Sequence, residues 1–195
     1  PVEDSNVYYV LSSVPGTTRG QLRSHPYKQA GDPFTSYEMF LYSVEKKATI
    51  KVTTPIIDFY EAPFLYWAKD NAHFYYEKID RGHQRYRMIE VDVANGETKN
   101  IIDEQTKTFV YDNLIFIHHL PATNEFIWTS EKDGWQHIYL IDALTGKQKN
   151  EITKGDYVVK DIDSVDEKKR EIWFSALGMA KGEDVYYVHY YRIGF

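Results

Sequence analysis

The sequence predicts an all-β fold, and within that class a partial β-propeller of about four blades, each an antiparallel meander of four strands. Three observations predict it: short runs rich in Tyr, Phe, Trp, Ile and Val, turns that end in glycine, and a repeated unit. Runs such as residues 37–44 and 85–91 alternate between apolar and polar residues, as strands do. No segment shows the sustained three-and-four spacing of apolar residues that an amphipathic helix requires.

The repeat becomes visible when equivalent strands are aligned. Residues 87–92 match residues 137–142 after a shift of 50 positions, and residues 189–194 after a further shift of 52. Residues 40–45 take the same place one unit earlier. A period of about 50 residues is typical of a propeller blade, whereas the strands of a β-sandwich show no such translation. We therefore place four blades within one domain, at residues 1–60, 61–107, 108–155 and 156–195.

The first unit has an irregular beginning. Strands are expected at residues 6–11 and 37–44, and a long insertion rich in Gly, Thr, Pro and Arg separates them at residues 15–32. A connection of that length is uncommon unless it has a function or is disordered. The insertion is locally basic, so both a contact arm and a solvated loop remain open; the basic residues are Arg19, Arg23, His25 and Lys28.

The three later units repeat one order of elements: an innermost strand, a tight turn, a second strand, a loop, and a third strand. We expect the innermost strands at residues 64–68, 114–117 and 158–162, the second strands at 74–77, 126–128 and 172–174, and the third strands at 85–91, 135–141 and 186–193. Turns at 92–96 and 142–146 end in a glycine, which is free to adopt the positive φ of a bulged hairpin.

The two ends of the chain look incomplete for a closed ring. The fourth unit stops before an outermost strand, and the first lacks an obvious innermost strand. Propellers close by pairing strands from both chain ends, which removes exposed edges. We therefore expect a fragment of a larger ring, with self-association through the open blade edges.

Composition excludes several functions. The chain has 195 residues, no cysteine, and 23 Lys and Arg against 29 Asp and Glu, for a formal net charge of −6. Without cysteine there is no disulfide framework and no Cys-ligated metal centre. The acidity argues against nucleic acid as a partner. Apolar runs are far shorter than the roughly 18 residues of a spanning helix, so we expect no membrane contact by this segment.

Several motifs resemble the dipeptidyl peptidase IV branch of the prolyl oligopeptidase family. Residues 130–139 (Ser-Glu-Lys-Asp-Gly-Trp-Gln-His-Ile-Tyr) and 153–159 resemble its blade motifs, and residues 182–187 fit the same style. Residues 26–31 resemble a Pro-Tyr-Pro-Lys-Ala-Gly element of that family, from which Lys28 and Gln29 depart. The resemblance implies a propeller above an α/β-hydrolase domain that this chain does not include, in a periplasmic, secreted or membrane-anchored extracellular serine dipeptidyl-peptidase.

The resemblance also implies a non-catalytic role, in which this segment restricts the access of peptides to its own catalytic domain. No glycine is followed two positions later by serine, so a nucleophile elbow is missing and we assign no catalytic residue. Of the family's functional residues, only Phe109, in the run at residues 108–112, matches a segment that lines the substrate cavity. Phe109 is therefore the candidate substrate-binding residue, and the expected partner is the peptide substrate of the parent enzyme.

Histidines provide the other candidate sites. His118 and His119 are the nearest approach to a metal-binding pair, but adjacent strand residues point to opposite faces, so we predict no metal and no cofactor. His137 and His189 occupy equivalent repeat positions, which indicates a recurring structural hydrogen bond. Residues 131–134 read as a charged blade turn, with contact to substrate or partner as the alternative.

The aromatic residues leave a second class of function open. The tyrosine-rich run at residues 186–191 is expected to pack blade against blade, and an aromatic binding platform is the alternative. Trp128, Trp135 and Trp173 stand at strand or strand-start positions, where core packing is the default. A free-standing propeller scaffold for protein–protein or carbohydrate binding is the competing hypothesis.

Overall fold

The computed structural model describes residues 7–12, 16, 18–26, 31–33, 35–58 and 62–195. Over these residues the regular structure is β-strand, apart from one 3-10 turn, η1 (Asp112–Leu114). The all-β class expected from the sequence is confirmed. Within the same ranges, no helix is long and apolar enough to span a membrane.

In the described part of the chain, fifteen strands form five antiparallel sheets. Two sheets are hairpins: β1 (Val7–Ser12) with β2 (Gln21–Pro26), and β3 (Phe40–Ser43) with β4 (Ala48–Lys51). Two sheets are four-stranded meanders, formed by β5 (Leu65–Trp67), β6 (His73–Ile79), β7 (Arg85–Asp92) and β8 (Thr98–Gln105), and by β9 (Ile117–Leu120), β10 (Glu125–Ser130), β11 (His137–Asp142) and β12 (Gln148–Glu151). The fifth has three strands, β13 (Val158–Asp166), β14 (Glu171–Leu177) and β15 (Val188–Gly194).

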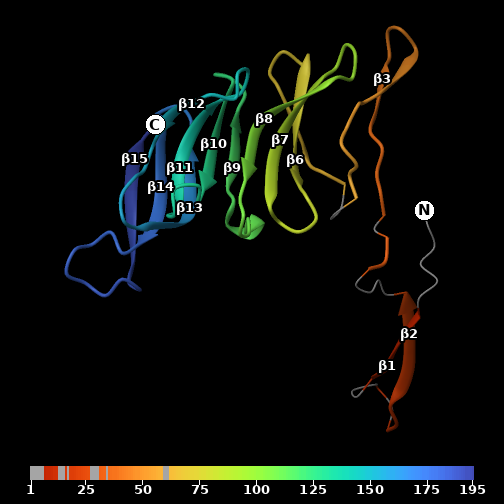
Figure 1. Cartoon of the computed structure of the whole chain (residues 1–195), viewed down its shortest axis with the longest axis horizontal. Coiled ribbons are helices and arrows are strands. Elements are labelled where there is room, and N and C mark those ends of the chain that lie inside the picture. The colour runs from red at the N-terminus through yellow and green to blue at the C-terminus, as the bar shows by residue number, and fades with distance from the viewer. Residues whose placement is uncertain (1–6, 13–15, 17, 27–30, 34, 59–61) are drawn as a thin grey trace.

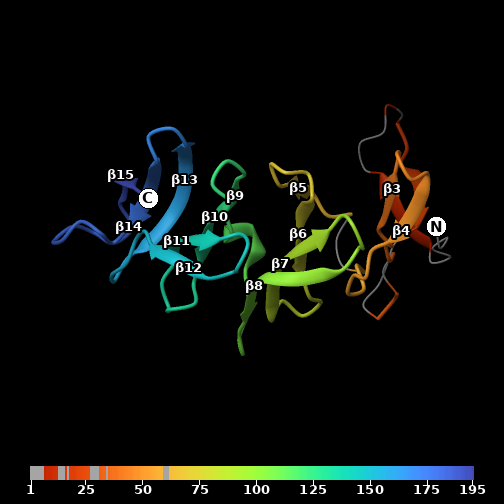
Figure 2. The ribbon, with the colours of Figure 1, turned by 90° about the horizontal axis from the view of Figure 1, so that it is seen from above.

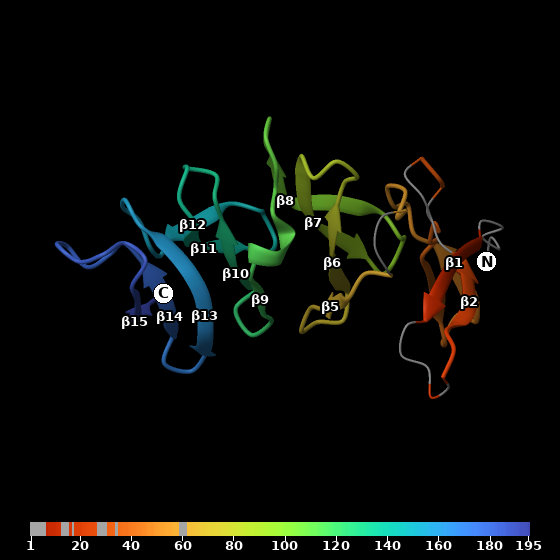
Figure 3. The same ribbon diagram turned by 90° about the horizontal axis from the view of Figure 1, so that it is seen from below.

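The sheets lie side by side in chain order, from the β3–β4 hairpin to β13–β15 (Figures 2 and 3). Only the β1–β2 hairpin stands apart from this row, as Figure 1 shows. Hairpin turns alternate between two edges of the row, so the β6–β7 and β10–β11 loops share one edge with the connection from β8 to β9.

Apolar cores fill the spaces between neighbouring sheets. Phe126 on β10 faces Tyr75 on β6, with the ring centroids 5.0 Å apart, and both belong to the core between the two meanders. The next residue, Ile127, belongs to the core shared with Ile172 and Phe174 of β14. A strand covered on both faces needs apolar residues at consecutive positions, which is why β10 does not alternate. Burying both faces of the inner strands therefore holds the row together.

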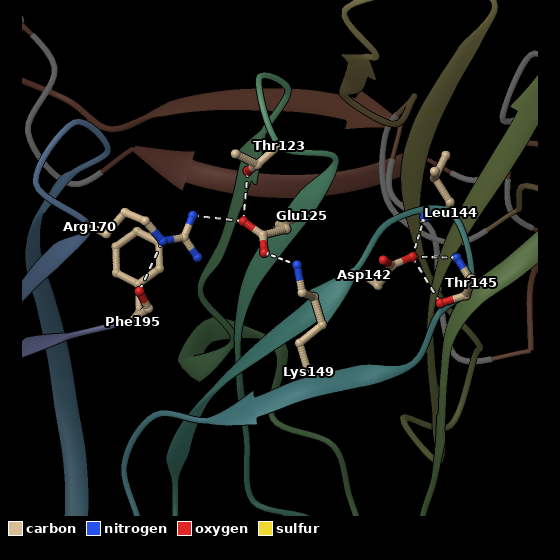
Figure 4. Close-up of polar contacts among 8 residues, drawn as sticks. All are labelled: Thr123, Glu125, Asp142, Leu144, Thr145, Lys149, Arg170 and Phe195. Carbon is tan, nitrogen blue, oxygen red and sulfur yellow. Dashed lines mark hydrogen bonds and ion pairs between the residues drawn. The ribbon is translucent and has the colours of Figure 1, made fainter.

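Two glycine turns, at Gly96 and Gly146, bring neighbouring sheets into close contact. Gly146, with φ +71°, closes the β11–β12 turn, and a Cβ atom there would lie 2.3 Å from the carbonyl oxygen of Ile101 on β8. Asp142 fixes the same turn, because its Oδ1 atom accepts the backbone N–H of Thr145 at 2.8 Å (Figure 4). Only glycine leaves room for this approach of one sheet to the next.

The first unit differs from the expected meander. Residues 21–26, expected within a loop, form β2 and pair with β1, in the register Leu11 opposite Leu22. The pairing supplies backbone hydrogen bonds that an open loop would have to find elsewhere. The described residues between 7 and 58 therefore form two separate hairpin sheets.

The third unit differs at its innermost strand, which was expected at residues 114–117 and begins instead at Ile117. Thr129 of β10 explains the shift. Its hydroxyl accepts the backbone N–H of Phe116 at 2.7 Å and donates to the carbonyl of Leu114 at 3.1 Å. Before β9 begins, the Thr129 side chain thus replaces the backbone hydrogen bonds that a paired strand would make. The residues just upstream form η1.

Candidate functional site

Phe109 lies in the connection between β8 and β9, and its ring is 54% exposed. It stacks on the imidazole of His83, from the β6–β7 loop, with the ring centroids 4.6 Å apart and the planes 17° apart. The centroid of the Tyr111 ring lies 6.4 Å from that of Phe109. His83 is itself held by the connection, because its Nδ1 atom lies 3.3 Å from the carbonyl oxygen of Val110 and 3.5 Å from Asp112 Oδ1. We call the rings of His83, Phe109 and Tyr111 the aromatic shelf.

A cavity of about 300 Å³ adjoins this shelf. Its walls come from the end of β8, from the connection that carries Phe109, and from the β10–β11 loop. The polar and charged side chains in its lining include Glu104, Thr106, Ser130, Glu131, Lys132 and Gln136. The sequence analysis named Phe109 as the candidate and left the loop at residues 131–134 open as a contact; the structure adds Glu104, Thr106, Ser130 and Gln136.

Two charged groups of opposite sign lie in the cavity wall. Glu104 Oε2 accepts a hydrogen bond from the hydroxyl of Ser130 at 2.6 Å. Burial raises the pKa of the Glu104 carboxyl, and the hydrogen bond from Ser130 opposes that rise. Burial lowers the pKa of the Lys132 ammonium. The Lys132 Nζ atom lies 3.7 Å from the centroid of the Tyr139 ring.

The loop at residues 131–134 behaves locally as a blade turn. Asp133 Oδ1 accepts the backbone N–H of Trp135 at 3.3 Å, and Gly134 has a φ of +97°. Both features were expected. Its neighbours Glu131 and Lys132 nevertheless line the cavity, so the alternative of a contact loop also has a structural basis.

The histidine pair is split between two faces of β9, as expected. His118 Nε2 lies 2.9 Å from Glu167 Oε1 on the β13–β14 turn, while His119 stacks on Phe126 in the core between the two meanders. Among the described residues, no group of three or more His, Asp or Glu side chains is placed to hold a metal ion.

The hydrogen bond that was expected to recur at His137 and His189 is not shared by the two residues. His137 is fully buried, with Nδ1 at 3.1 Å from Thr153 Oγ1 and Nε2 at 2.9 Å from the carbonyl oxygen of Gly155. His189 instead pairs with Glu183 at 2.9 Å, on a partly exposed strand. The two differ because His137 lies between two sheets whose neighbouring loop reaches it, whereas β15 is the last strand of its sheet.

Of the aromatic residues that were expected to pack in the core, some are buried and others are exposed. Trp128 is buried, but Trp135 is 41% exposed, because it precedes β11 and lies in the loop. Tyr191 packs on Phe174 with centroids 5.6 Å apart, whereas Tyr186, Tyr187 and Tyr190 are exposed. The expectation of packing was thus wrong for Trp135 and for these three tyrosines. Of the family-like element at residues 26–31, positions 27–30 lie outside the described residues, as does Lys28 of the basic insertion.

A family model decides the affiliation of the chain. The model of the dipeptidyl peptidase IV (DPP IV) N-terminal region matches residues 3–194. The chain belongs to this family. The partial β-propeller predicted from the sequence is thereby confirmed together with the resemblance that accompanied it.

Relatives of the DPP IV N-terminal region family include named peptidases. The chain is 26% identical over 156 residues to dipeptidyl peptidase 4 of Trichophyton rubrum, a match that covers 78% of this chain and 20% of the relative. It is 28% identical over 101 residues to a probable dipeptidyl peptidase 4 of Neosartorya fischeri, covering 49% of this chain and 13% of the relative. The first match thus spans about a fifth of the length of that curated relative.

Two solved structures show the same fold. Dipeptidyl peptidase 4 of Porphyromonas gingivalis matches with a TM-score of 0.69 and 20% identity, over 91% of this chain and 25% of that one. A putative dipeptidyl aminopeptidase IV from Bacteroides ovatus matches with a TM-score of 0.62 and 19% identity, over 88% and 27%. The chain therefore has the same fold as the matching parts of these two structures.

Proposed function

We propose that this chain is the part of a DPP IV-type propeller that restricts the access of peptides to the catalytic domain of a serine exopeptidase, without catalytic side chains of its own. Family membership and the names of the relatives support the parent activity. We also propose a periplasmic, secreted or membrane-anchored extracellular location for the parent. The peptide substrate and the parent's own catalytic domain are the proposed partners.

The observation that carries the proposal is an exposed aromatic ring held rigidly beside a cavity. Ordering an exposed side chain on binding costs conformational entropy. Phe109 is already stacked on His83, so its ring offers an apolar surface at a lower cost. The cavity beside it has hydrogen-bonding groups from three segments. A peptide side chain can insert there while its backbone crosses the shelf.

The test compares two phenylalanines of equal exposure. Phe109 and Phe40 are both 54% exposed, and Phe40 lies on β3, in the sheet beyond the meander that carries the shelf. We expect calorimetric binding of an unblocked hexapeptide with proline at its second position to weaken about tenfold in Phe109→Ala, a loss of about 1.4 kcal/mol. Binding should be unchanged in Phe40→Ala. Equal effects of the two substitutions would remove Phe109 from the site.

The non-catalytic role has its own test. The purified chain should not hydrolyse a chromogenic X-Pro dipeptide substrate. Turnover that a serine-directed inhibitor abolishes would overturn this part of the proposal. A turnover that survives the inhibitor would indicate a contaminating peptidase of another class, which repurification removes.

The open face of β13–β15 supports self-association as a further partner interaction. Tyr190, Val188 and Leu177 lie on the face of this sheet that points away from β9–β12. The corresponding faces of the two meanders are covered by the next sheet. A second copy of this chain is the partner that we propose for the open face.

A further inference from the structure

Glu104 is a half-buried carboxylate of the cavity wall that has no salt bridge, unlike several other acidic residues in the described part of the chain. Glu125 pairs with Lys149 and Arg170, Asp103 with Arg85, and Asp80 with Arg87. Among the described residues, no Lys, Arg or His nitrogen lies within 4 Å of the Glu104 carboxylate. The neutral hydroxyl of Ser130 donates a hydrogen bond to one of its oxygens.

The cation in the cavity wall is held by other groups. Lys132 Nζ donates a hydrogen bond to Gln148 Oε1 on β12 at 2.6 Å. The same ammonium lies over the Tyr139 ring and 5.4 Å from the centroid of the Trp128 ring. These contacts direct Lys132 toward β11 and β12, so the Glu104 carboxylate remains available to a cation that enters the cavity.

The charges of the lining favour such a cation. Glu104 and Glu131 oppose Lys132, which leaves the cavity with an excess of negative charge. Phe109 and Tyr111 of the aromatic shelf line the same cavity and suit the same kind of ligand, since a guanidinium plane or the methylene stem of a basic side chain packs well on an aromatic face. A carboxylate and an exposed aromatic ring that line the same cavity together match a long basic side chain.

We propose that this cavity is a subsite for a basic peptide side chain, with Glu104 accepting hydrogen bonds from its guanidinium or ammonium group and Phe109 packing against its stem. The proposal rests on the proposed function, because it assigns a charge preference to the peptides that reach the shelf. Ser130 orients the carboxylate, and Lys132 opposes the bound cation. Glu104 is thus a specificity-determining residue of the propeller.

A pair of isosteric probes tests the charge preference. Acetyl-arginine amide and acetyl-citrulline amide have nearly the same shape, but only the first carries a charge. We expect calorimetry on the whole chain to show the arginine probe binding about tenfold more tightly, as a hydrogen bond between charged groups allows. Glu104→Gln, which keeps the bond to Ser130, should reduce that preference to less than about twofold.

Glu97→Gln is the matched control, because Glu97 is exposed in the β7–β8 turn at the opposite edge of the sheet. It removes the same charge and should leave the preference unchanged. Lys132→Met provides an independent variant: removing the opposing ammonium should tighten the arginine probe at least about twofold and leave the citrulline probe unchanged. A preference that survives Glu104→Gln, or falls equally in Glu97→Gln, would overturn the subsite.

The outcomes separate this subsite from the proposed function. Equal binding of the two probes, with both lost in Phe109→Ala, would overturn the charge preference and leave the aromatic shelf as a peptide contact. Binding of neither probe, together with unchanged hexapeptide binding in Phe109→Ala, would overturn both.

Discussion

Arg170 on the β13–β14 turn donates a hydrogen bond from Nη1 to Glu125 Oε2 at the start of β10, at 2.8 Å (Figure 4). The Glu125 side chain is only 2% exposed. It also accepts hydrogen bonds from Lys149 on β12 and from Thr123 Oγ1 at 2.7 Å. Arg170 Nε donates in turn to the carbonyl oxygen of Phe195 at 3.0 Å. One carboxylate therefore joins two neighbouring sheets and the C-terminal residue.

Glu125→Gln should destabilise the protein, by an amount that depends on pH. Burial alone raises the pKa of Glu125, but the hydrogen bonds from Lys149, Arg170 and Thr123 outweigh it and lower the pKa to about 2, from the ordinary 4.5. A carboxyl whose folded-state pKa is depressed stabilises the fold above its unfolded pKa, and this stability is lost as the pH falls through the folded value.

We expect wild type to exceed Glu125→Gln by about 1–3 kcal/mol in free energy of unfolding at pH 7, measured by urea titration. The difference should narrow steadily between about pH 5 and pH 2. A difference that stays constant over this range would show that the carboxylate charge does not carry the contact. Glu97→Gln supplies the baseline for an exposed glutamate.

Gly146→Ala should separate steric contact from backbone strain. Gly146 and Gly134 both have positive φ, at +71° and +97°, but only a Cβ at Gly146 would meet the Ile101 carbonyl oxygen, whereas at Gly134 nothing lies within 4 Å. Gly134→Ala should therefore cost about 1–2 kcal/mol from left-handed strain. Gly146→Ala should cost about 1–3 kcal/mol more, because the two sheets must move apart. Equal costs in urea unfolding would contradict the close approach.

The fold was largely predictable, because each later unit combines strand composition with turn chemistry. The Asp-to-Gly turns at residues 92–96 and 142–146 are formed as expected, with Gly96 N–H donating to the Asp92 carbonyl at 2.8 Å and Gly146 N–H to that of Asp142 at 2.9 Å. The β1–β2 hairpin was missed, since Gln-Leu-Arg-Ser-His-Pro has little alternation. The start of β9 was misplaced because a long-range side-chain bond from Thr129 decides it.

The site was less predictable. Phe109 was identified through family resemblance, and no pattern in the neighbouring sequence predicts a cavity. Glu104, Ser130 and Lys132 come from two strand ends and a loop, and only the packing of one meander on the next brings them together. The charged loop at residues 131–134 was the available signal, and it reads equally well as an ordinary turn.

Thr129→Val should weaken the wall of the cavity as well as the fold. The substitution keeps the shape of the side chain but removes the hydroxyl that binds both Phe116 N–H and Leu114 carbonyl. Because Thr129 is buried, these backbone groups lose a partner that water cannot readily replace, and we expect a loss of about 1–3 kcal/mol in urea unfolding. Thr108→Val, at an exposed lining position, should cost less than about 0.5 kcal/mol. Similar losses in the two variants would show that the hydroxyl is dispensable.

Tyr190→Asp should prevent the proposed association of two copies through the open face of β13–β15. Tyr190 is 76% exposed, while the residues at corresponding register positions, Met88 on β7 and Ile138 on β11, are fully buried by the next sheet. A position that holds an apolar or aromatic residue, covered in two sheets of the described chain and open in the third, is typical of a surface that becomes buried on association. A charge placed there opposes burial without disturbing the core on the other face of the sheet.

Sedimentation velocity over a range of concentrations provides the measurement. Wild type should show a concentration-dependent dimer, and Tyr190→Asp a monomer at all concentrations. Tyr186→Asp is the control, because Tyr186 is exposed in the β14–β15 loop and outside the strand face, so this variant should associate as wild type does. Wild type that stays monomeric at the highest concentration would contradict the association. Equal dissociation in both variants would show that the contact is not confined to the sheet face.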